Sequence, residues 1–364
     1  ELRAHIHKLY HTNLDKISGI INNMEILTGI SLKPYTTMRL GGETQFMATA
    51  TSVNDIKEIY QYAKQHKLPV FVLGGGSNVI TRDEEYQGVV LLNRLKGFDV
   101  IEDDGSTVRM KVAAGEVWDE VVARSVEMGL QGIEAMSAIP GTAGAAPVQN
   151  IGAYGQEIAD TLVSLEAYDS LTDEVVTFDA KDCQFGYRHS IFRGQATGRY
   201  CIINMTLQLS HSDPQPPFYT ALQRYFDDKS IAAPYNVKMI RDAVIEIRRD
   251  KLPNPKQNPN TGSFFKNALI SSQQFEELQK NFPNMPYYNM PDDMVKIPTG
   301  WLIEQCGFKG KVLHGMRVHD KNALVLINES ATGYADLSAA REEIIKAVFD
   351  KFQIKIQQEP LELE

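Results

Sequence analysis

Ser263 lies in Gly262-Ser-Phe-Phe-Lys-Asn267, where a hydroxyl stands between a glycine and two aromatic residues, with Lys266 and Asn267 close behind. This order concentrates hydrogen-bond donors against an apolar wall, although an ordinary turn into a strand has a similar composition. The nucleophile signature Gly-x-Ser-x-Gly is not present, and none of the eight histidines is an evident base. If Ser263 does chemistry, its setting therefore favours proton donation to a carbanion-like centre.

Two glycine-rich segments could hold a phosphate or a cofactor. Gly74-Gly-Gly-Ser-Asn78 follows the apolar run Pro69-Val-Phe-Val-Leu73, and a longer stretch of glycine, alanine and proline runs from Ile139 to Gly155. Such residues let backbone N–H groups approach a ligand, and consecutive N–H groups in turns form anion-binding concavities. Either segment alone could be a tight connection between packed elements. Their occurrence in one chain favours a cofactor site.

Neither segment has the pattern of a Rossmann or P-loop site. The Rossmann fingerprint needs Gly-x-Gly-x-x-Gly opening a helix, whereas Val79-Ile80 continues in extended form and Thr81 to Glu85 is turn-like. The P-loop pattern Gly-x-x-x-x-Gly-Lys-Ser/Thr does not occur. We therefore expect a phosphate site made by backbone N–H groups without a Rossmann helix.

Arg188 lies inside an aromatic, glycine-bearing segment, Phe185-Gly-Tyr-Arg-His-Ser-Ile-Phe-Arg193. Arginine recognises carboxylates and phosphates through its planar fork of donors. Its long side chain can equally pack along apolar surface. Anion recognition and packing both remain open for Arg188 on these grounds.

The composition excludes several classes of protein. A chain of 364 residues is expected to form two or three domains, and its net charge of -9 argues against a nucleic-acid partner. No apolar run approaches the length of a membrane span, so no membrane partner is expected. The three cysteines are widely separated, which favours a reducing, cytoplasmic setting. His5, His7 and His11 have no ligand partners at metal-site spacing, so no metal is expected. The start at Glu1 and the closing Leu363-Glu364 are interpreted as a trimmed start and a cloning remnant.

Periodicity predicts the elements that position these residues. Leu14, Ile17, Ile21 and Met24 recur at helical spacing, and Ser52 with Asp55 should cap a helix that buries Ile56, Ile59, Tyr60 and Ala63. Hairpins are expected around Asp104-Gly105 and over 162–178. Further helices are expected over 117–126, 237–249, 272–282, 301–305 and 336–352, and strands over 69–73, 200–209, 323–327 and 354–360. A linker is expected over 251–261.

Taken in order, the motifs resemble the UDP-N-acetylenolpyruvoylglucosamine reductase family. The segments that carry the resemblance are Gly-Gly-Gly-Ser-Asn78, Ile-Pro-Gly141 followed by Pro-Val-Gln-Asn-Ile-Gly-Ala-Tyr-Gly155, Phe-Gly-Tyr-Arg188, Lys-Leu-Pro253, Gly-Ser-Phe-Phe-Lys-Asn267 and Ala-Leu-Val-Leu-Ile-Asn328. The resemblance covers the chain from about Leu32 to Pro360. Tyr219 and the Tyr154 segment are similar to the type I branch, whereas the region before Ile30 has no counterpart.

The resemblance implies an α+β flavoprotein of peptidoglycan precursor synthesis. It implies a two-part FAD-binding domain of the vanillyl-alcohol-oxidase (PCMH) type, with residues 30–96 and 354–364 in one part and 97–252 in the other. A C-terminal α/β substrate-binding domain would span 253–353, and 1–29 would be an extension of unknown role. NADPH would supply electrons, UDP-N-acetylglucosamine enolpyruvate would be the substrate, and a monomer is expected. The implied FAD-binding residues are Gly74, Gly75, Gly76, Ser77, Asn78, Pro140, Gly141, Gly144, Gln149, Asn150, Gly152, Ala153, Tyr154 and Gly155.

The resemblance also implies roles at the reacting centre. Ser263 would give a proton, while Arg188 and Glu359 would polarise the substrate carboxylate; a raised pKa in a closed pocket would keep Glu359 protonated. The implied substrate-binding residues are Tyr187, Arg188, Tyr219, Lys251, Ser263 and Asn267, with Tyr219, Lys251 and Asn267 on the uridine diphosphate.

Departures from the family pattern lie near these residues. Gln357 stands where the family has an acidic residue, and Glu362 is an alternative to Glu359 that requires an insertion. Ala145-Ala146 replaces small hydroxyl residues, so the backbone is expected to supply a flavin hydrogen bond there.

Two other functions stay open. One is an FAD-dependent oxidase or dehydrogenase of the same fold that acts on another substrate, such as an alcohol or a sugar. The other is a nucleotide-sugar binding protein without catalysis. The reductase interpretation predicts a yellow protein whose flavin is bleached by NADPH, and intact Ser263 and Glu359 count against a protein that only binds.

Overall fold

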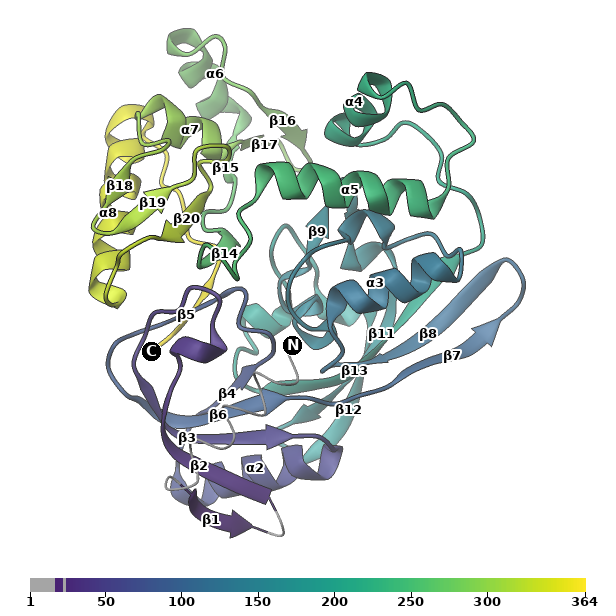
Figure 1. The fold of residues 1–364 in the computed structure, drawn as a ribbon, viewed down its shortest axis with the longest axis vertical. Helices are drawn as coiled ribbons and strands as arrows, with labels where there is room; N and C mark the ends of the chain where they lie inside the picture. Colours follow the sequence, from purple (N-terminus) through teal and green to yellow (C-terminus); the bar gives the residue numbers. More distant parts are fainter. Residues whose placement is uncertain (1–16, 22–23) are drawn as a thin grey trace. The chain divides into compact units, whose positions relative to one another are not determined.

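A computed structural model describes residues 17–21 and 24–364 (Figure 1). Contacts between residues divide the chain into two units, each described here by itself. Unit 1 comprises Glu1–Ser31, Glu43–Gly76 and Glu85–Arg248, and unit 2 comprises Leu32–Gly42, Ser77–Glu84 and Arg249–Glu364. Both units mix helices and strands, as expected for an α+β protein. The domain boundaries implied by the resemblance stay a prediction.

The first sheet of unit 1 combines antiparallel and parallel pairs in the order β1-β2-β3-β6-β4 (Figure 1). Its strands are β1 (Ile17–Ile21), β2 (Met24–Ser31), β3 (Glu43–Ala50), β4 (Val70–Leu73) and β6 (Tyr86–Asn93). Helix α2 (Val53–His66) follows β3 in the chain and packs on this sheet. Ser52 and Asp55 form the predicted capping box, and the predicted inner face of α2 is buried.

The predicted N-terminal helix is wrong where the structure describes it. Ile17–Ile21 is a strand that pairs antiparallel with β2, with an irregular register between Ile17 and Gly19. The isoleucines recur at a spacing that also fits a helix, but β-branched residues favour strands and a glycine weakens a helix. His5, His7 and His11 lie outside the described residues.

The second sheet of unit 1 is antiparallel, in the order β12-β11-β13-β8-β7. Its strands are β7 (Phe98–Asp103), β8 (Thr107–Ala113), β11 (Leu162–Asp169), β12 (Glu174–Asp179) and β13 (Tyr200–Ser210). Asp104 closes the β7–β8 turn, because its Oδ1 accepts the N–H groups of Ser106 at 2.8 Å and Thr107 at 2.7 Å. Both predicted hairpins and the predicted helix, α3 (Trp118–Glu127), are confirmed.

Shorter elements complete unit 1. Strands β9 (Gly152–Ala153) and β10 (Gln156–Glu157) pair at the end of the Ile139 to Gly155 stretch. Helices α4 (Thr220–Asp228) and α5 (Val237–Lys251) pack together through a shared apolar cluster. Ile240, Val244 and Ile247 recur at helical spacing on α5 and are buried in this cluster. Helix α5 continues past its predicted end at Arg249. The chain passes from unit 1 to unit 2 after Arg248, which lies inside this helix.

Unit 2 surrounds its own apolar core with small sheets. One sheet has the order β14-β20-β19-β18 and another the order β15-β17-β16. The strands are β14 (Asn260–Ser263), β15 (Ala268–Ser271), β16 (Tyr288–Met290), β17 (Met294–Ile297), β18 (Val312–Leu313), β19 (Met316–Val318) and β20 (Val325–Asn328). The helices are α6 (Ser272–Asn281), α7 (Thr299–Gln305) and α8 (Tyr334–Phe352). The apolar face of α8, with Leu337, Ala340, Ile344 and Val348, is buried.

The C-terminal strand lies later in the chain than predicted. Residues 354–360 are irregular, and the strand is β21 (Leu361–Leu363), which pairs in parallel with β5 (Val79–Thr81). Ile354 and Ile356 alternate as in a strand, but each is only 2% exposed because both enter the apolar core of unit 2. Core packing therefore produced the strand-like pattern without a ladder of backbone hydrogen bonds.

Candidate functional site

The two glycine-rich segments touch within unit 1. A Cβ added to Gly74 would lie 2.4 Å from Oγ1 of Thr142, and one added to Gly75 would lie 2.9 Å from the Cα of Gly141. Real Cβ atoms do not approach other backbone this closely, so only glycine fits at Gly75 without a shift of the chain. The two segments therefore lie side by side, and their expected role in holding a cofactor stays a prediction. The rest of the first loop, Ser77 and Asn78, belongs to unit 2.

The N–H groups of Ala143–Ala146 are already used by the protein. They donate at 2.8 to 3.1 Å to the carbonyl oxygens of Glu116, Ala114, Thr142 and Ala143, in that order. Gly144 is also tightly packed, because a Cβ there would lie 2.5 Å from the Cβ of Ala114. The N–H groups of Ala145 and Ala146 thus have partners within the protein, and the flavin hydrogen bond expected from the backbone stays a prediction. Any N–H donors of this stretch lie at its other residues.

The Arg188 segment wraps the end of the long stretch. Ser190 Oγ donates to the carbonyl oxygen of Val148 at 2.6 Å, and Arg193 Nη1 donates to Gln149 Oε1 at 2.6 Å. Asn150 is fully buried: its Nδ2 donates to the carbonyl oxygen of Gly186 at 3.3 Å, and its Oδ1 accepts the N–H of Ala159 at 3.0 Å. Gln149 and Asn150 thus fix the loop through their side chains, which the sequence did not reveal.

Arg188 itself points back to this loop. Its Nη2 donates to the carbonyl oxygen of Gly152 at 3.0 Å, and its guanidinium lies 5.5 Å from the ring centroid of Tyr187. Arg188 and Tyr154 both have left-handed backbone, with φ of 52° and 49°. Such strain in residues other than glycine clusters at functional sites. The ring of Tyr154 meets that of Tyr219 edge-on at 5.9 Å, so Arg188 and Tyr219 both contact residues 152–154 of the long loop.

Arg248 is a candidate site residue that the sequence analysis did not identify. It lies on α5, and its side chain hydrogen-bonds Tyr154. Burial lowers the pKa of Arg248, and the nearby charge of Arg188 acts in the same direction. Within the described residues, the buried Nε of Arg248 has no hydrogen-bond partner. Two guanidinium groups close together, with a buried donor left over, make a setting for an anion.

In unit 2 the fold brings Ser263 next to Glu359. Ser263 ends β14, and the two phenylalanines that follow it are 0% exposed. The N–H of Glu359 donates to the carbonyl oxygen of Phe264 at 2.8 Å, and the N–H of Lys266 donates to that of Gln357 at 2.9 Å. Glu359 is 8% exposed. The two residues that the resemblance marks as proton donor and acid therefore lie on neighbouring segments.

The remaining predicted residues of unit 2 lie nearby in the chain. Asn267 Oδ1 accepts the N–H of Thr299 at 3.2 Å, which fixes its amide at the start of α7. Lys251 is exposed at the end of α5. Glu362, the alternative to Glu359, is already engaged, because its carboxylate bonds with Arg82, Tyr334 and Arg341.

Comparison with known proteins gives the family. Residues 44–179 match the model of an FAD binding domain, and residues 254–362 match the C-terminal domain of UDP-N-acetylenolpyruvoylglucosamine reductase. The enzyme of that name from Ralstonia nicotianae is 42% identical over 331 residues, covering 90% of this chain and 96% of the relative. The one from Flavobacterium johnsoniae is 39% identical over 338 residues, covering 92% and 99%.

The chain belongs to the UDP-N-acetylenolpyruvoylglucosamine reductase family. Its fold is similar to the crystal structure of the reductase (MurB) from Thermus caldophilus, with a TM-score of 0.64, 19% identity and coverage of 93% of this chain and 98% of that one. It is also similar to 6-hydroxy-D-nicotine oxidase from Arthrobacter nicotinovorans, with a TM-score of 0.50, 14% identity and coverage of 91% and 86%. At these identities both likenesses show the fold alone. The predicted fold, an FAD-binding domain followed by a reductase C-terminal domain, is confirmed.

The residues of unit 1 fit the FAD that this reductase family requires. Gly75 and Gly141 bring the two glycine-rich loops into direct backbone contact, and glycine loops of this kind can offer N–H groups to a pyrophosphate. Over the described part of the chain, no group of histidine, cysteine and acidic residues is arranged to hold a metal ion. No helix in that part is long and apolar enough to cross a membrane.

Proposed function

We propose that this protein reduces the enolpyruvyl ether of UDP-N-acetylglucosamine enolpyruvate to UDP-N-acetylmuramate, with bound FAD and with NADPH as the electron source. This is a step in peptidoglycan precursor synthesis. The observation that carries the proposal is the match of residues 254–362 to the reductase C-terminal domain. An oxidase of the same flavin fold would share the FAD-binding domain, but it would not need the C-terminal domain of the reductase. We therefore favour the reductase.

Residues of both glycine-rich segments would hold the cofactor. In unit 2 these are Ser77 and Asn78, and in unit 1 they are Gly74, Gly75, Gly76, Pro140, Gly141, Gly144, Gln149, Asn150, Gly152, Ala153, Tyr154 and Gly155. Bound FAD supplies the hydride for the reaction after NADPH has reduced it. Asn150 and Arg193 stiffen the loop that would face the cofactor, and such preorganisation lowers the entropy lost on binding.

The proposed catalytic roles follow from where charge develops. Addition of hydride to an enolpyruvyl group places negative charge on the carbon that bears the carboxylate, and on the carboxylate itself. Arg188 would bind that carboxylate, and Arg248 adds a second guanidinium whose buried Nε lacks a partner among the described residues. In unit 2, Ser263 would donate the proton, and protonated Glu359 would polarise the carboxylate.

Further contacts would bind the rest of the substrate. We assign Tyr187 to substrate binding, and Tyr219, Lys251 and Asn267 to the uridine diphosphate. The edge-on contact of Tyr219 with Tyr154 supports a role for Tyr219 beside the long loop. We also propose that the protein is monomeric and acts in the cytoplasm.

The test is a visible absorption spectrum of protein reconstituted with FAD, recorded without oxygen. NADPH should bleach the flavin band, and UDP-N-acetylglucosamine enolpyruvate should then restore it with formation of UDP-N-acetylmuramate. A protein that takes up no FAD would contradict the proposal. Bleaching by an alcohol or a sugar without NADPH would support the oxidase alternative, and binding of the sugar nucleotide without turnover would support the non-catalytic one.

A further inference from the structure

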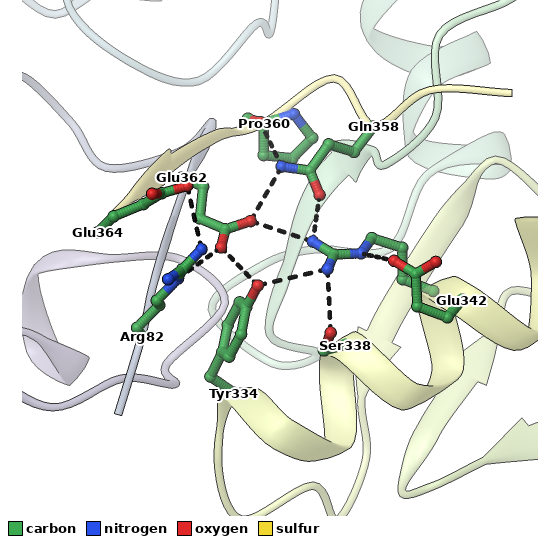
Figure 2. Close-up of polar contacts among 9 residues, drawn as sticks. Arg82, Tyr334, Ser338, Glu342, Gln358, Pro360, Glu362 and Glu364 are labelled. Carbon is green, nitrogen blue, oxygen red and sulfur yellow. Dashed lines mark hydrogen bonds and ion pairs between the residues drawn. The ribbon is translucent and has the colours of Figure 1, made fainter. Parts of the chain in front are cut away.

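The segment that carries Glu359 is held by one polar cluster, which we call the tail cluster: Arg82, Tyr334, Arg341, Gln358 and Glu362 (Figure 2). All five residues belong to unit 2. They come from the loop after β5, from α8 and from the C-terminal segment. None of them has been assigned a role in the reaction above.

Glu362 is the centre of the tail cluster. Its Oε1 accepts from Arg82 Nε at 2.8 Å and from the hydroxyl of Tyr334, and its Oε2 accepts from Arg341 Nη1 at 3.0 Å (Figure 2). The side chains of Glu362 and Arg341 are only 12% and 13% exposed. Charge-assisted hydrogen bonds with so little solvent access are strong and directional. Glu362 therefore fixes the position of the chain three residues after Glu359.

Arg341 also fixes the residue before Glu359. The same Nη1 that binds Glu362 donates to Gln358 Oε1 at 2.7 Å, and Gln358 Nε2 donates to the carbonyl oxygen of Pro360 at 3.2 Å. Ser338 Oγ accepts from Arg341 Nη2 at 2.9 Å, which holds the guanidinium against α8 (Figure 2). One arginine thus clamps both flanks of Glu359.

The backbone next to the tail cluster leads to Ser263 and to the first glycine-rich loop. The N–H of Glu359 donates to Phe264, the residue after Ser263, and the N–H of Leu361 donates to the carbonyl oxygen of Asn78 at 3.0 Å. Residues 354–360 form no strand, but an isolated antiparallel bridge joins Phe265 to Gln358. The side chains of the tail cluster add anchors on both sides of Glu359, where this backbone pairing is short.

We propose that the tail cluster positions Glu359 relative to Ser263, so that Glu362, Arg341 and Gln358 are positioning residues for the reduction of the substrate. This inference rests on the proposed function, because it takes Glu359 as the catalytic acid. Glu362 does not replace Glu359 in the reaction; it acts through Glu359. Its loss should impair the half-reaction that consumes the sugar nucleotide and leave the half-reaction with NADPH unchanged.

The test compares both half-reactions in FAD-loaded protein by stopped-flow absorbance. In Glu362→Gln, flavin reduction by NADPH should stay within about twofold of the parent, while reoxidation by the sugar nucleotide should slow about ten- to a hundredfold, the cost of a small misplacement. Glu342→Gln is the matched control, because Glu342 also bonds Arg341, at 3.1 Å, but is 63% exposed and lies outside the tail. It should leave both rates unchanged.

A double variant separates positioning from a general structural effect. In a Glu359→Gln background, adding Glu362→Gln should change reoxidation by less than about twofold, since residues that act as a unit are not additive. Hydrogen exchange of the FAD-free chain should show faster exchange at Glu359 and Leu361 in Glu362→Gln, with α2 unaffected. If Glu362→Gln does not fold, Gln358→Ala replaces it in these experiments, because it removes one anchor of the same segment. The same slowing of reoxidation and the same faster exchange are expected.

Different results overturn different claims. Reoxidation at the parental rate in Glu362→Gln, despite faster exchange in the tail, would overturn the positioning role alone. An equal slowing in the parent and Glu359→Gln backgrounds would show that Glu362 does not act through Glu359. Parental activity of Glu359→Gln by itself would instead remove Glu359 from the proposed function.

Discussion

The proposed proton transfer depends on the hydroxyl of Ser263. Ser263→Ala should leave flavin reduction by NADPH unchanged but slow reoxidation by the sugar nucleotide about 10²- to 10⁴-fold, the usual range for loss of a positioned proton donor. Rapid mixing of reduced enzyme with substrate measures this step directly. Ser272→Ala is a control, since Ser272 Oγ only donates to the carbonyl oxygen of Asp293 at 3.1 Å on the surface. Equal reoxidation in Ser263→Ala and the parent would remove the assignment.

Arg248 should matter for substrate binding rather than for the cofactor. Arg248→Met removes a charge and the buried Nε donor, so the KM for the enolpyruvyl substrate should rise about 10- to 100-fold, equivalent to a charged hydrogen bond of about 1.5–3 kcal/mol. Flavin reduction by NADPH should not change. Arg249→Met, at the exposed neighbouring position, should leave KM as in the parent. An unchanged KM in Arg248→Met would mean that this guanidinium only packs against Tyr154.

These residues also mark how far the sequence predicts the site. Ser263 and the two glycine-rich segments stand out through residue type and order, whereas Glu359 follows only from the family resemblance. The structure pairs Glu359 with Phe264, the neighbour of Ser263, and Gly75 with Gly141. Arg248 could not be found in this way, because an arginine on an amphipathic helix usually lies on the solvated face. Arg248 lies about one helical turn before Lys251, which the resemblance implies as a substrate-binding residue. That spacing on one helix is the sequence signal that could have identified Arg248.

At the scale of elements, the contact between the two glycine-rich loops predicts a specific sensitivity. Gly75→Ala forces the backbone of one loop away from Gly141, at a cost of about 1–3 kcal/mol, so FAD affinity should fall at least tenfold. Titration of flavin fluorescence measures this affinity.

Gly300→Ala is the matched control for the loop variant. Gly300 lies in α7, and the nearest atom to its added Cβ would be 3.5 Å away. Because alanine favours helices, this variant should gain up to about 1 kcal/mol and bind FAD normally. If Gly75→Ala binds FAD as tightly as Gly300→Ala, the loop contact does not shape the cofactor site.

The anchoring of β21 predicts a pH dependence of stability. Burial alone would raise the pKa of Glu362, but hydrogen bonds from Tyr334 and Arg82 and the charge of Arg341 lower it below the ordinary value of 4.5. A carboxyl whose pKa is lowered on folding contributes stability above the pKa of the unfolded chain and loses it as pH falls through the folded pKa. Glu362→Gln should therefore cost about 1.5–3 kcal/mol of unfolding free energy at pH 7.

Urea unfolding at several pH values checks this expectation. The difference between parent and Glu362→Gln should shrink as pH falls below 4.5 toward the lower folded pKa. Glu329→Gln breaks the more exposed pair with Arg317, and its cost at pH 7 should be at most about 1 kcal/mol. A difference that stays constant with pH would mean that the Glu362 carboxylate is not the source of the stability.

Most elements follow from local pattern, and the exceptions have physical causes. The cap and apolar face of α2 and the Asp104 turn depend on neighbours in the chain, so the sequence predicts them well. β1 and the tail depend on distant partners. The isoleucines of β1 fit two periods, and Ile354 and Ile356 alternate because a core surrounds them. Tertiary pairing decides which of these apolar patterns forms a ladder of backbone hydrogen bonds with another strand.

For the whole molecule, cofactor binding should appear as stability. Each unit has an apolar core of its own, so unfolding of the chain need not be two-state. FAD at about one hundred times its dissociation constant should stabilise the folded protein by about 2.7 kcal/mol, because it binds only the folded form. Calorimetry with and without FAD should therefore show a higher melting temperature for the loaded protein. An identical melting curve would contradict the FAD assignment.

The pairing of β5 with β21 has a consequence for synthesis of the protein. β5 is made early, but its parallel partner, residues 361–363, follows every other described element in the chain. A growing chain folds from its N-terminal end, so β5 keeps one edge uncovered until translation has passed Leu363. The segment that carries Glu359 also follows every helix of unit 2 in the chain. If Glu359 is the acid, as we propose, catalysis should begin only after this last segment has been made and has docked.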